Sequence, residues 1–279
     1  LRLLVRHHDA PVYTISYYAH WLLMERIAAS GYRVSVSGSA GDELLSGYYD
    51  HHLMYLAEMH ADPALYEEAR SAWEKHIRPM VRNPHLRDPG LFVRDPGFRD
   101  HLTLNSEEFR TYLKKDWSEP FTEEAYNGSL LRNRMLNELL HESIPVVLHE
   151  DDINAMYFSI ENRSPFLDRE LVEFCNRIPT RHLIRDGRAK AILRDAMRGI
   201  VPDVVVDERR KVGFNVPIFS FLDVKDPAVR EEVLGPSPIY DHVRREKIEA
   251  LMDKPFLENH ESLFLFYFLC AKLFLEEFT

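Results

Sequence analysis

One stretch of the chain, from Ser37 to Tyr48, places a glycine-containing turn between a strand and a helix. Residues 32–36 before it alternate in a β-branched pattern that predicts a short buried strand. After it, apolar residues recur at helical spacing to about His60. In open α/β sheets, ligands bind beyond the carboxyl ends of the strands, where such turns lie. This stretch is therefore the first candidate site.

The side chains of this turn suit phosphate or a metal ion. Gly38 and Gly41 allow sharp bends and expose backbone N–H groups at a helix N-terminus, which favours an anion. Asp42 and Glu43 fall in the first helical turn, where they either complement the helix dipole or hold a metal ion that carries phosphates. The same pattern is also common scaffolding, and no P-loop or dinucleotide fingerprint occurs in the chain. The turn alone leaves both interpretations open.

Composition narrows the class of protein. The 279 residues are 45% hydrophobic and 29% charged, as is ordinary for soluble globular proteins. The formal net charge of −10 argues against nucleic acid as a partner, because phosphate contacts need a basic surface. We see no signal peptide and no run of 18 apolar residues, so we expect no membrane partner. Cys175 and Cys270 lie in apolar helical patterns and predict free thiols, which fits a cytoplasmic location.

Most of the remaining chain is predicted to be helical, which leaves only a remnant of a parallel sheet near the N-terminus. A proline-rich stretch, 78–101, predicts a long irregular excursion. The last helix is rich in phenylalanine, so it is either a core helix or a packing surface of a homodimer. The predicted helices cover residues 14–30, 62–76, 106–115, 129–149, 169–177, 188–199, 241–253 and 260–278.

A second stretch, 151–168, holds charged residues among apolar ones. After Glu161 and Arg163, residues 165–167 turn the chain into a helix that Asp168 caps. Charges are costly to bury unless they are paired. Glu161 and Arg163 are therefore either a structural ion pair that locks the turn or residues that shape a binding pocket.

A third stretch is basic. Lys190 and Arg194 are four residues apart and share one helix face. Lys211 precedes Gly213 and Phe214, which places a cation on a loop just before aromatic packing. Such a lysine can neutralise the charge that develops on a phosphate leaving group. A solvated basic loop is the alternative.

Two histidine-containing runs also resemble sites. In the run 48–52, Tyr48 and His52 are four apart, but no second carboxylate or histidine pair completes a metal geometry, so we assign no metal there. The run 7–9, His-His-Asp, is expected to end a strand-to-loop transition.

Taken together, the three stretches resemble, in their order and spacing, the synthetase domain of the asparagine synthetase family, which includes β-lactam synthetase. The resemblance covers roughly residues 3–220. The family pattern SGxGxDExxxGY matches Ser37, Gly38, Asp42, Glu43, Gly47 and Tyr48. The pattern SxExRxPFLD matches Ser159, Glu161, Arg163, Pro165, Phe166, Leu167 and Asp168. The patterns KxxLR and RxKxGFxxP match Lys190, Leu193, Arg194, Arg209, Lys211, Gly213, Phe214 and Pro217.

This resemblance implies a fold and a reaction. The fold is α/β: the C-terminal, mostly helical portion of an adenine-nucleotide α-hydrolase-like (ATP pyrophosphatase) domain, with residues 1–279 forming part of the synthetase domain. The implied reaction is adenylation of a small-molecule carboxylate by ATP and Mg²⁺. Ammonia, taken from glutamine, or an amine then attacks the acyl-adenylate, and an amide and AMP are formed.

The resemblance also implies roles for individual residues. Asp42 resembles the aspartate that binds Mg²⁺ and pyrophosphate, and Lys211 resembles the lysine that stabilises the adenylation transition state. Glu161 and Arg163 resemble a pair that shapes the same pocket. We expect the nucleotide to be bound by Asp42 together with Ser37, Gly38, Gly41 and Lys190.

Two departures from the family pattern matter. The family's SGGxDS pyrophosphate loop is absent, so we expect it upstream of residue 1 together with a glutaminase domain, and we expect the fragment alone to be inactive. Ser39 stands where asparagine synthetases have a glutamate base, and serine is a poor base. A divergent ligase that amidates another carboxylate, such as a sugar uronate in surface-polysaccharide synthesis, is one hypothesis. A non-catalytic scaffold that retains the fold is the other.

Overall fold

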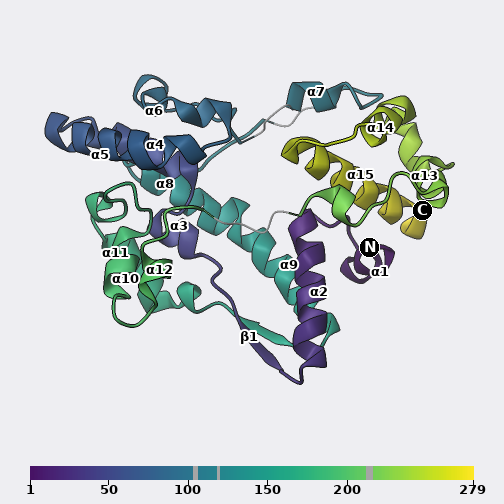
Figure 1. Ribbon diagram of the computed structural model, residues 1–279, viewed down its shortest axis with the longest axis horizontal. Coiled ribbons are helices and arrows are strands. Elements are labelled where there is room, and N and C mark those ends of the chain that lie inside the picture. Colours follow the sequence, from purple (N-terminus) through teal and green to yellow (C-terminus); the bar gives the residue numbers. More distant parts are fainter. Residues whose placement is uncertain (103–105, 118–119, 212–215) are drawn as a thin grey trace.

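The computed structural model describes residues 1–102, 106–117, 120–211 and 216–279. The described chain is mostly helical, with two short strands (Figure 1). The α-helices are α1 (Arg2–His8), α2 (Ile15–Ala29), α3 (Gly41–Leu45), α4 (Tyr49–Met59), α5 (Pro63–His76), α6 (Leu91–Arg94), α7 (Ser106–Arg110), α8 (Leu130–Asn137), α9 (Ile144–Tyr157), α10 (Arg169–Arg177), α11 (Ala191–Ala196), α12 (Asp203–Val206), α13 (Pro227–Leu234), α14 (Arg245–Met252) and α15 (Asn259–Phe278). The strands are β1 (Val34–Val36) and β2 (Glu161–Arg163). Shorter turns are η1 (Arg78–Met80), η2 (Pro84–Arg87), the π-helical η3 (Glu138–Glu142), η4 (Pro165–Leu167), η5 (Thr180–His182), η6 (Ile218–Ser220) and η7 (Pro238–Asp241).

The two strands confirm the predicted remnant of a parallel sheet. β1 pairs with β2 in parallel, and Val34, Ser35 and Val36 lie opposite Glu161, Asn162 and Arg163. The expectation of a buried strand is wrong, because Val34 is 43% exposed and Val36 is 69% exposed. Parallel sheets are normally covered on both faces, but β1 has β2 as its only strand neighbour among the described residues.

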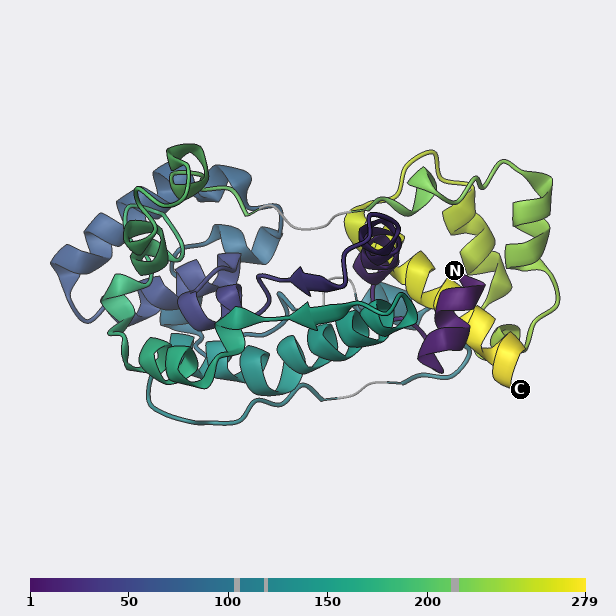
Figure 2. The same ribbon diagram turned by 90° about the horizontal axis from the view of Figure 1, so that it is seen from below.

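Two large hydrophobic cores hold most of the helices, and a small third cluster of Met24, Ala155 and Ile160 joins α2 to α9. One core is formed by α1, α2 and α13–α15, and Phe266 is completely buried in it. The other surrounds α4 and includes Trp73 of α5 and Phe92 of α6. Figure 2 shows these two helical groups at opposite ends of the molecule, with β1, β2 and α9 running between them. Asp42 of α3 and its partners Lys190 and Lys211 lie in the group that contains α3 and α4.

Several predicted elements differ from the observed ones. The run 7–9 ends the helix α1 rather than a strand, and Asp9 closes it with a left-handed φ of 50°. The predicted helix 129–149 is divided into α8, η3 and α9, because a π-helical turn follows Asn137 and Pro145 lies in the first turn of α9. The proline-rich excursion folds into short turns that bury Leu86 and Phe92 against the core around α4.

The long terminal helix α15 packs in the hydrophobic core. This agrees with the first of the two roles that the sequence predicted for it, a core helix or a packing surface of a homodimer. Phe266 and Phe268 are buried, whereas Tyr267 is 40% exposed. Among the described residues, no helix combines the length and apolar character needed to cross a membrane.

Candidate functional site

The turn after β1 is tied to the segment after β2. The Ser37 N–H donates to the Arg163 carbonyl oxygen at 2.8 Å. The Ser37 hydroxyl oxygen lies 3.1 Å from those of both Ser39 and Ser164. Ala40 then adopts a left-handed φ of 72° and α3 begins at Gly41. The first two sequence motifs therefore lie side by side, although about 120 residues separate them.

Asp42 is the centre of the site. The Lys190 ammonium nitrogen lies 2.7 Å from Asp42 Oδ1, and the Lys211 ammonium contacts Asp42 Oδ2. The Lys211 nitrogen also lies 4.8 Å from the centre of the Tyr48 ring, in a cation–π contact. The first and third motifs thus converge on one carboxylate.

The environment of Asp42 keeps its carboxylate charged. Burial tends to raise the pKa of Asp42, but Lys190 and Lys211 outweigh burial and lower it. Apart from the ion pair with Lys190, Asp42 Oδ1 has no hydrogen-bond donor among the described residues, although it is buried. A charged, buried oxygen of this kind fits a divalent cation such as Mg²⁺.

A cavity of about 480 Å³ opens beside Asp42. Its lining is basic on balance, because five lysine and arginine residues face only two acids. The lining residues are Asp42, Gly47, Tyr49, His52, Ala189, Lys190, Arg194, Val204, Val205, Glu208, Arg209, Arg210 and Lys211. The cavity is therefore suited to an anion with several negative charges, such as a chain of phosphates.

The arginines that line the cavity already have partners within the protein. Arg194 donates to the carbonyl oxygens of Ala189, Val205 and Val206, so it holds the two walls together. Arg210 is paired with Glu208, at 2.7 Å between Nη2 and Oε2. The lysines, by contrast, have only Asp42 as an acidic partner in the described residues. They are the cations best placed to turn toward a ligand.

Glu161 and Arg163 do not join this cavity. They form an ion pair with 2.8 Å between Arg163 Nε and Glu161 Oε1, and both side chains are about 60% exposed. Because they are two residues apart in β2, they lie on the same face of the strand. The hydrogen bond from Arg163 lowers the pKa of Glu161. The structure brings Asp42, Lys190 and Lys211 together, whereas Glu161 and Arg163 lie outside the cavity that those three residues line.

The remaining predicted site residues are not part of the lining of the cavity. Ser37, Gly38 and Ser39 form the turn before α3, and none of them lines the cavity. A Cβ atom on Gly41 would lie 3.4 Å from the Phe166 ring, so Gly41 allows η4 to approach α3. Gly213 and Phe214 of the third motif lie outside the described residues.

Sequence reasoning missed two supports of the site. The Tyr48 hydroxyl donates to the buried Glu43, which fixes the ring beneath Lys211. Burial raises the pKa of Glu43 in spite of this hydrogen bond. His52 lies one helical turn after Tyr49 and lines the cavity with it. The family pattern already contained Glu43 and Tyr48, but it did not show that they contact each other.

Replacing Gly47 by alanine is expected to destabilise the fold by roughly 1–3 kcal/mol, as overpacking does. A Cβ atom there would lie 1.6 Å from Asp42 Oδ1, so the carboxylate or the start of α4 must move. Urea unfolding measures the effect. Gly38→Ala is the matched control, because its Cβ would meet nothing within 4 Å. Equal stabilities for the two variants would contradict the close approach of Gly47 and Asp42.

His52 is expected to make the fold sensitive to acid. Burial lowers its pKa to about 3, well below the value of about 6.5 in an unfolded chain. As pH falls from about 6.5 toward 3, His52 becomes protonated in the unfolded state but stays neutral in the folded state. Stability present above about pH 6.5 is therefore lost at about 1.4 kcal/mol per pH unit, or ~2 kcal/mol by pH 5.

The comparison of wild type with His52→Gln isolates this contribution. Urea unfolding at pH 7 and pH 5 should show a smaller loss for His52→Gln than for wild type. The exposed His60 provides the control, since His60→Gln should leave the loss unchanged. The same loss in all three proteins would show that His52 is not buried in its neutral form.

The fold and the cavity together define a mostly helical α/β protein with a basic cavity built around one carboxylate. The sequence model of the asparagine synthase family matches residues 1–269. The chain therefore belongs to the asparagine synthase family.

Curated relatives agree with this membership at modest identity. The glutamine-hydrolysing asparagine synthetase 1 of Bacillus subtilis is 26% identical over 205 residues, which cover 68% of this chain and 31% of the relative. A putative glutamine-hydrolysing asparagine synthetase of Mycobacterium bovis is 27% identical over 212 residues, which cover 71% of this chain and 32% of the relative. Amidase chry2 of Gibberella zeae is 22% identical over 220 residues, which cover 68% of this chain and 33% of the relative. The chain thus spans about a third of the length of these relatives.

Proposed function

We propose that this chain contributes Asp42, Lys190 and Lys211 to the pyrophosphate-binding site of an ATP-dependent ligase, which adenylates a carboxylate and converts it to an amide with ammonia from glutamine. The observation that carries the proposal is the convergence of Lys190 and Lys211 on Asp42 at a basic cavity. Membership of the asparagine synthase family and the names of the curated relatives support the reaction class. The proposed cofactors are ATP and Mg²⁺.

Different residues of the cavity would bind the metal ion and the phosphate oxygens. Asp42 with its two lysines carries one net positive charge, so an incoming phosphate chain meets an attractive site. Asp42 would hold Mg²⁺, which neutralises phosphate oxygens when it is bound. Lys190 and Lys211 would then turn from Asp42 to the phosphate oxygens.

Lys211 would act during adenylation. Negative charge grows on the pyrophosphate as the carboxylate attacks the α-phosphorus atom and the bond to the β-phosphate breaks. A fixed cation near the leaving group stabilises that charge. The contact with the Tyr48 ring restrains the Lys211 ammonium beside Asp42, which reduces the motion needed at this step.

The acceptor carboxylate is proposed to differ from aspartate. Ser39 occupies the position of the glutamate base in asparagine synthetases, and the hydrogen bond with the Ser37 hydroxyl gives it no basic partner. A sugar uronate in surface-polysaccharide synthesis is the proposed alternative substrate. The glutamine-derived ammonia is proposed to come from a glutaminase domain of the same protein, and a homodimer remains a prediction.

An assay of the polypeptide that carries this chain tests the proposal. With ATP, Mg²⁺ and glutamine, we expect a uronate to be converted to its amide with release of AMP and pyrophosphate. Rapid formation of asparagine from aspartate would remove the reason for proposing another acceptor. If no carboxylate supports exchange of labelled pyrophosphate into ATP, the non-catalytic scaffold is the better account.

A further inference from the structure

A second cavity, of about 330 Å³, is formed where α4 and α5 meet the segment 181–187. The helices α4 and α5 pack side by side, and η5, where that segment begins, also packs against α4 (Figure 1). This cavity plays no part in the proposed adenylation. We propose that it binds a free α-amino acid whose side chain is uncharged and forms hydrogen bonds.

Two buried side chains in the wall of this cavity have no hydrogen-bond partner. Trp73 of α5 is 1% exposed, and its Nε1–H group is unpaired among the described residues. His52 of α4 is 4% exposed, and its ring forms no hydrogen bond within the described part of the chain. Buried polar groups are nearly always paired, so both side chains indicate that a hydrogen-bonding group occupies the cavity.

The two side chains also define the kind of group that they can bind. The Trp73 Nε1–H group is a donor only, so it needs an acceptor. The imidazole of His52 is neutral, because burial lowers its pKa to about 3, and a neutral imidazole has one donor and one acceptor. An amide or a hydroxyl group satisfies both residues. A charged side chain would lose its hydration in this wall without gaining an opposite charge.

The rest of the buried wall is apolar and the cavity is small. Leu56 and Ile184 are 1% and 4% exposed, and Tyr55 adds a buried aromatic ring. A mainly apolar lining with a few polar groups is typical of small-molecule sites, which span about 300–1,000 Å³. The second cavity lies at the lower end of this range, so it suits a ligand of the size of an amino acid rather than a nucleotide.

The rim of the cavity carries charges of both signs. Arg185 and Asp186 each lie within ion-pair distance of another residue. Glu68 has no oppositely charged partner among the described residues, and the guanidinium of Arg181 contacts only the neighbouring His182 there, at 3.3 Å. A zwitterion can satisfy both unpaired charges, because its carboxylate can meet Arg181 and its ammonium group can meet Glu68.

The phosphate cavity is the main competing site, because its lysines also attract a carboxylate. His52 lines both cavities, so a change at His52 alone does not identify which cavity is occupied. Variants that distinguish them must replace residues that line only one cavity. Ala69 and Arg181 line the second cavity alone, and Lys211 lines the phosphate cavity alone.

Calorimetric titration of this chain with L-glutamine, L-asparagine and L-leucine, without ATP, tests the proposal independently of the proposed ligase activity. We expect glutamine or asparagine to bind with one equivalent. Leucine cannot pair with Trp73 or His52, so it should bind about tenfold more weakly or less. Trp73→Phe removes the N–H group but keeps an aromatic ring, and it should weaken binding of the amide roughly 3- to 10-fold.

Two pairs of variants locate the bound amino acid. Ala69→Leu places a larger side chain in the wall of the cavity and should abolish binding, whereas Ala64→Leu, an exposed position of α5 outside the lining, should retain it. Arg181→Ala should weaken binding roughly 3- to 10-fold, whereas Arg177→Ala, an exposed arginine outside the lining, should not. Arg181 is itself exposed, so its replacement tests the site even if Ala69→Leu fails to fold.

Three results would overturn the proposal. The first is that none of the three amino acids binds to the wild-type chain at millimolar concentration, which would mean that water fills the cavity and pairs with Trp73 and His52. The second is binding that Lys211→Ala abolishes and Ala69→Leu leaves unchanged, which would place the amino acid in the phosphate cavity. The third is equal affinity for leucine and the two amides, which would exclude hydrogen bonds to the side chain.

Discussion

Replacing Lys211 by alanine is expected to weaken binding of magnesium pyrophosphate to this chain by roughly 10- to 100-fold. Hydrogen bonds to charged groups contribute about 1.5–3 kcal/mol, and about 1.4 kcal/mol corresponds to a factor of ten in affinity. Lys211 shares its acidic partner Asp42 with Lys190, so one positive charge of this lysine pair stays unbalanced and can meet an anionic ligand. Isothermal titration calorimetry measures the change directly.

Arg210 provides the matched control for this experiment. It lines the same cavity and carries the same charge, but Glu208 already neutralises it. Arg210→Ala should therefore change the affinity by less than about threefold, as expected for an exposed ion pair. Equal losses for Lys211→Ala and Arg210→Ala would show that the cavity attracts the anion only through its overall charge.

Replacing Arg134 by methionine is expected to destabilise the fold by about 3–5 kcal/mol. The Arg134 side chain is 3% exposed and forms ion pairs with Glu123, Glu138 and Glu142. Methionine fills much of the same space but leaves these carboxylates without their cation, and unpaired buried charges are strongly destabilising. The melting temperature should fall by on the order of 10 °C.

An exposed arginine tests whether burial of the ion pairs causes the loss of stability in Arg134→Met. Arg169 is 90% exposed and pairs with Glu173 one turn along α10. Arg169→Met should therefore change the stability by less than about 0.5 kcal/mol. A comparable loss in Arg169→Met, or no loss in Arg134→Met, would contradict the interpretation of the buried ion pairs.

The parts of the fold that the sequence could predict are those set by local pattern. The helical spacing from residue 14 to 30 predicted α2, and the left-handed Gly31 follows its end. The family resemblance assigned Asp42, Lys190 and Lys211 to one nucleotide site, and in the structure both lysines contact Asp42. The roles of the three residues stay predictions.

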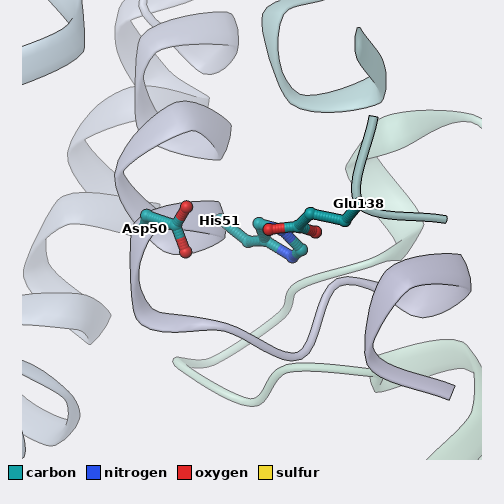
Figure 3. Close-up of side chains that lie close together, drawn as sticks. All are labelled: Asp50, His51 and Glu138. Atoms are coloured by element: carbon teal, nitrogen blue, oxygen red, sulfur yellow. The ribbon is translucent and has the colours of Figure 1, made fainter. Parts of the chain in front are cut away.

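The parts that could not be predicted depend on neighbours from distant elements. Glu161 and Arg163 were expected in the cavity, but alternation along β2 places them together on one exposed face. His51 was visible in the sequence, but its buried partner Glu138 lies 87 residues later, and only the three-dimensional structure shows that the two side chains meet (Figure 3). The predicted burial of β1 was wrong for the same reason, because a parallel strand is buried only where elements from elsewhere in the chain cover both faces of its sheet.

The most direct test of the central claim is a crystal structure of this chain with magnesium pyrophosphate. We predict phosphate oxygens within hydrogen-bonding distance of the Lys190 and Lys211 ammonium groups and Mg²⁺ bound to Asp42. Pyrophosphate bound elsewhere, with both lysines still paired to Asp42, would contradict the account.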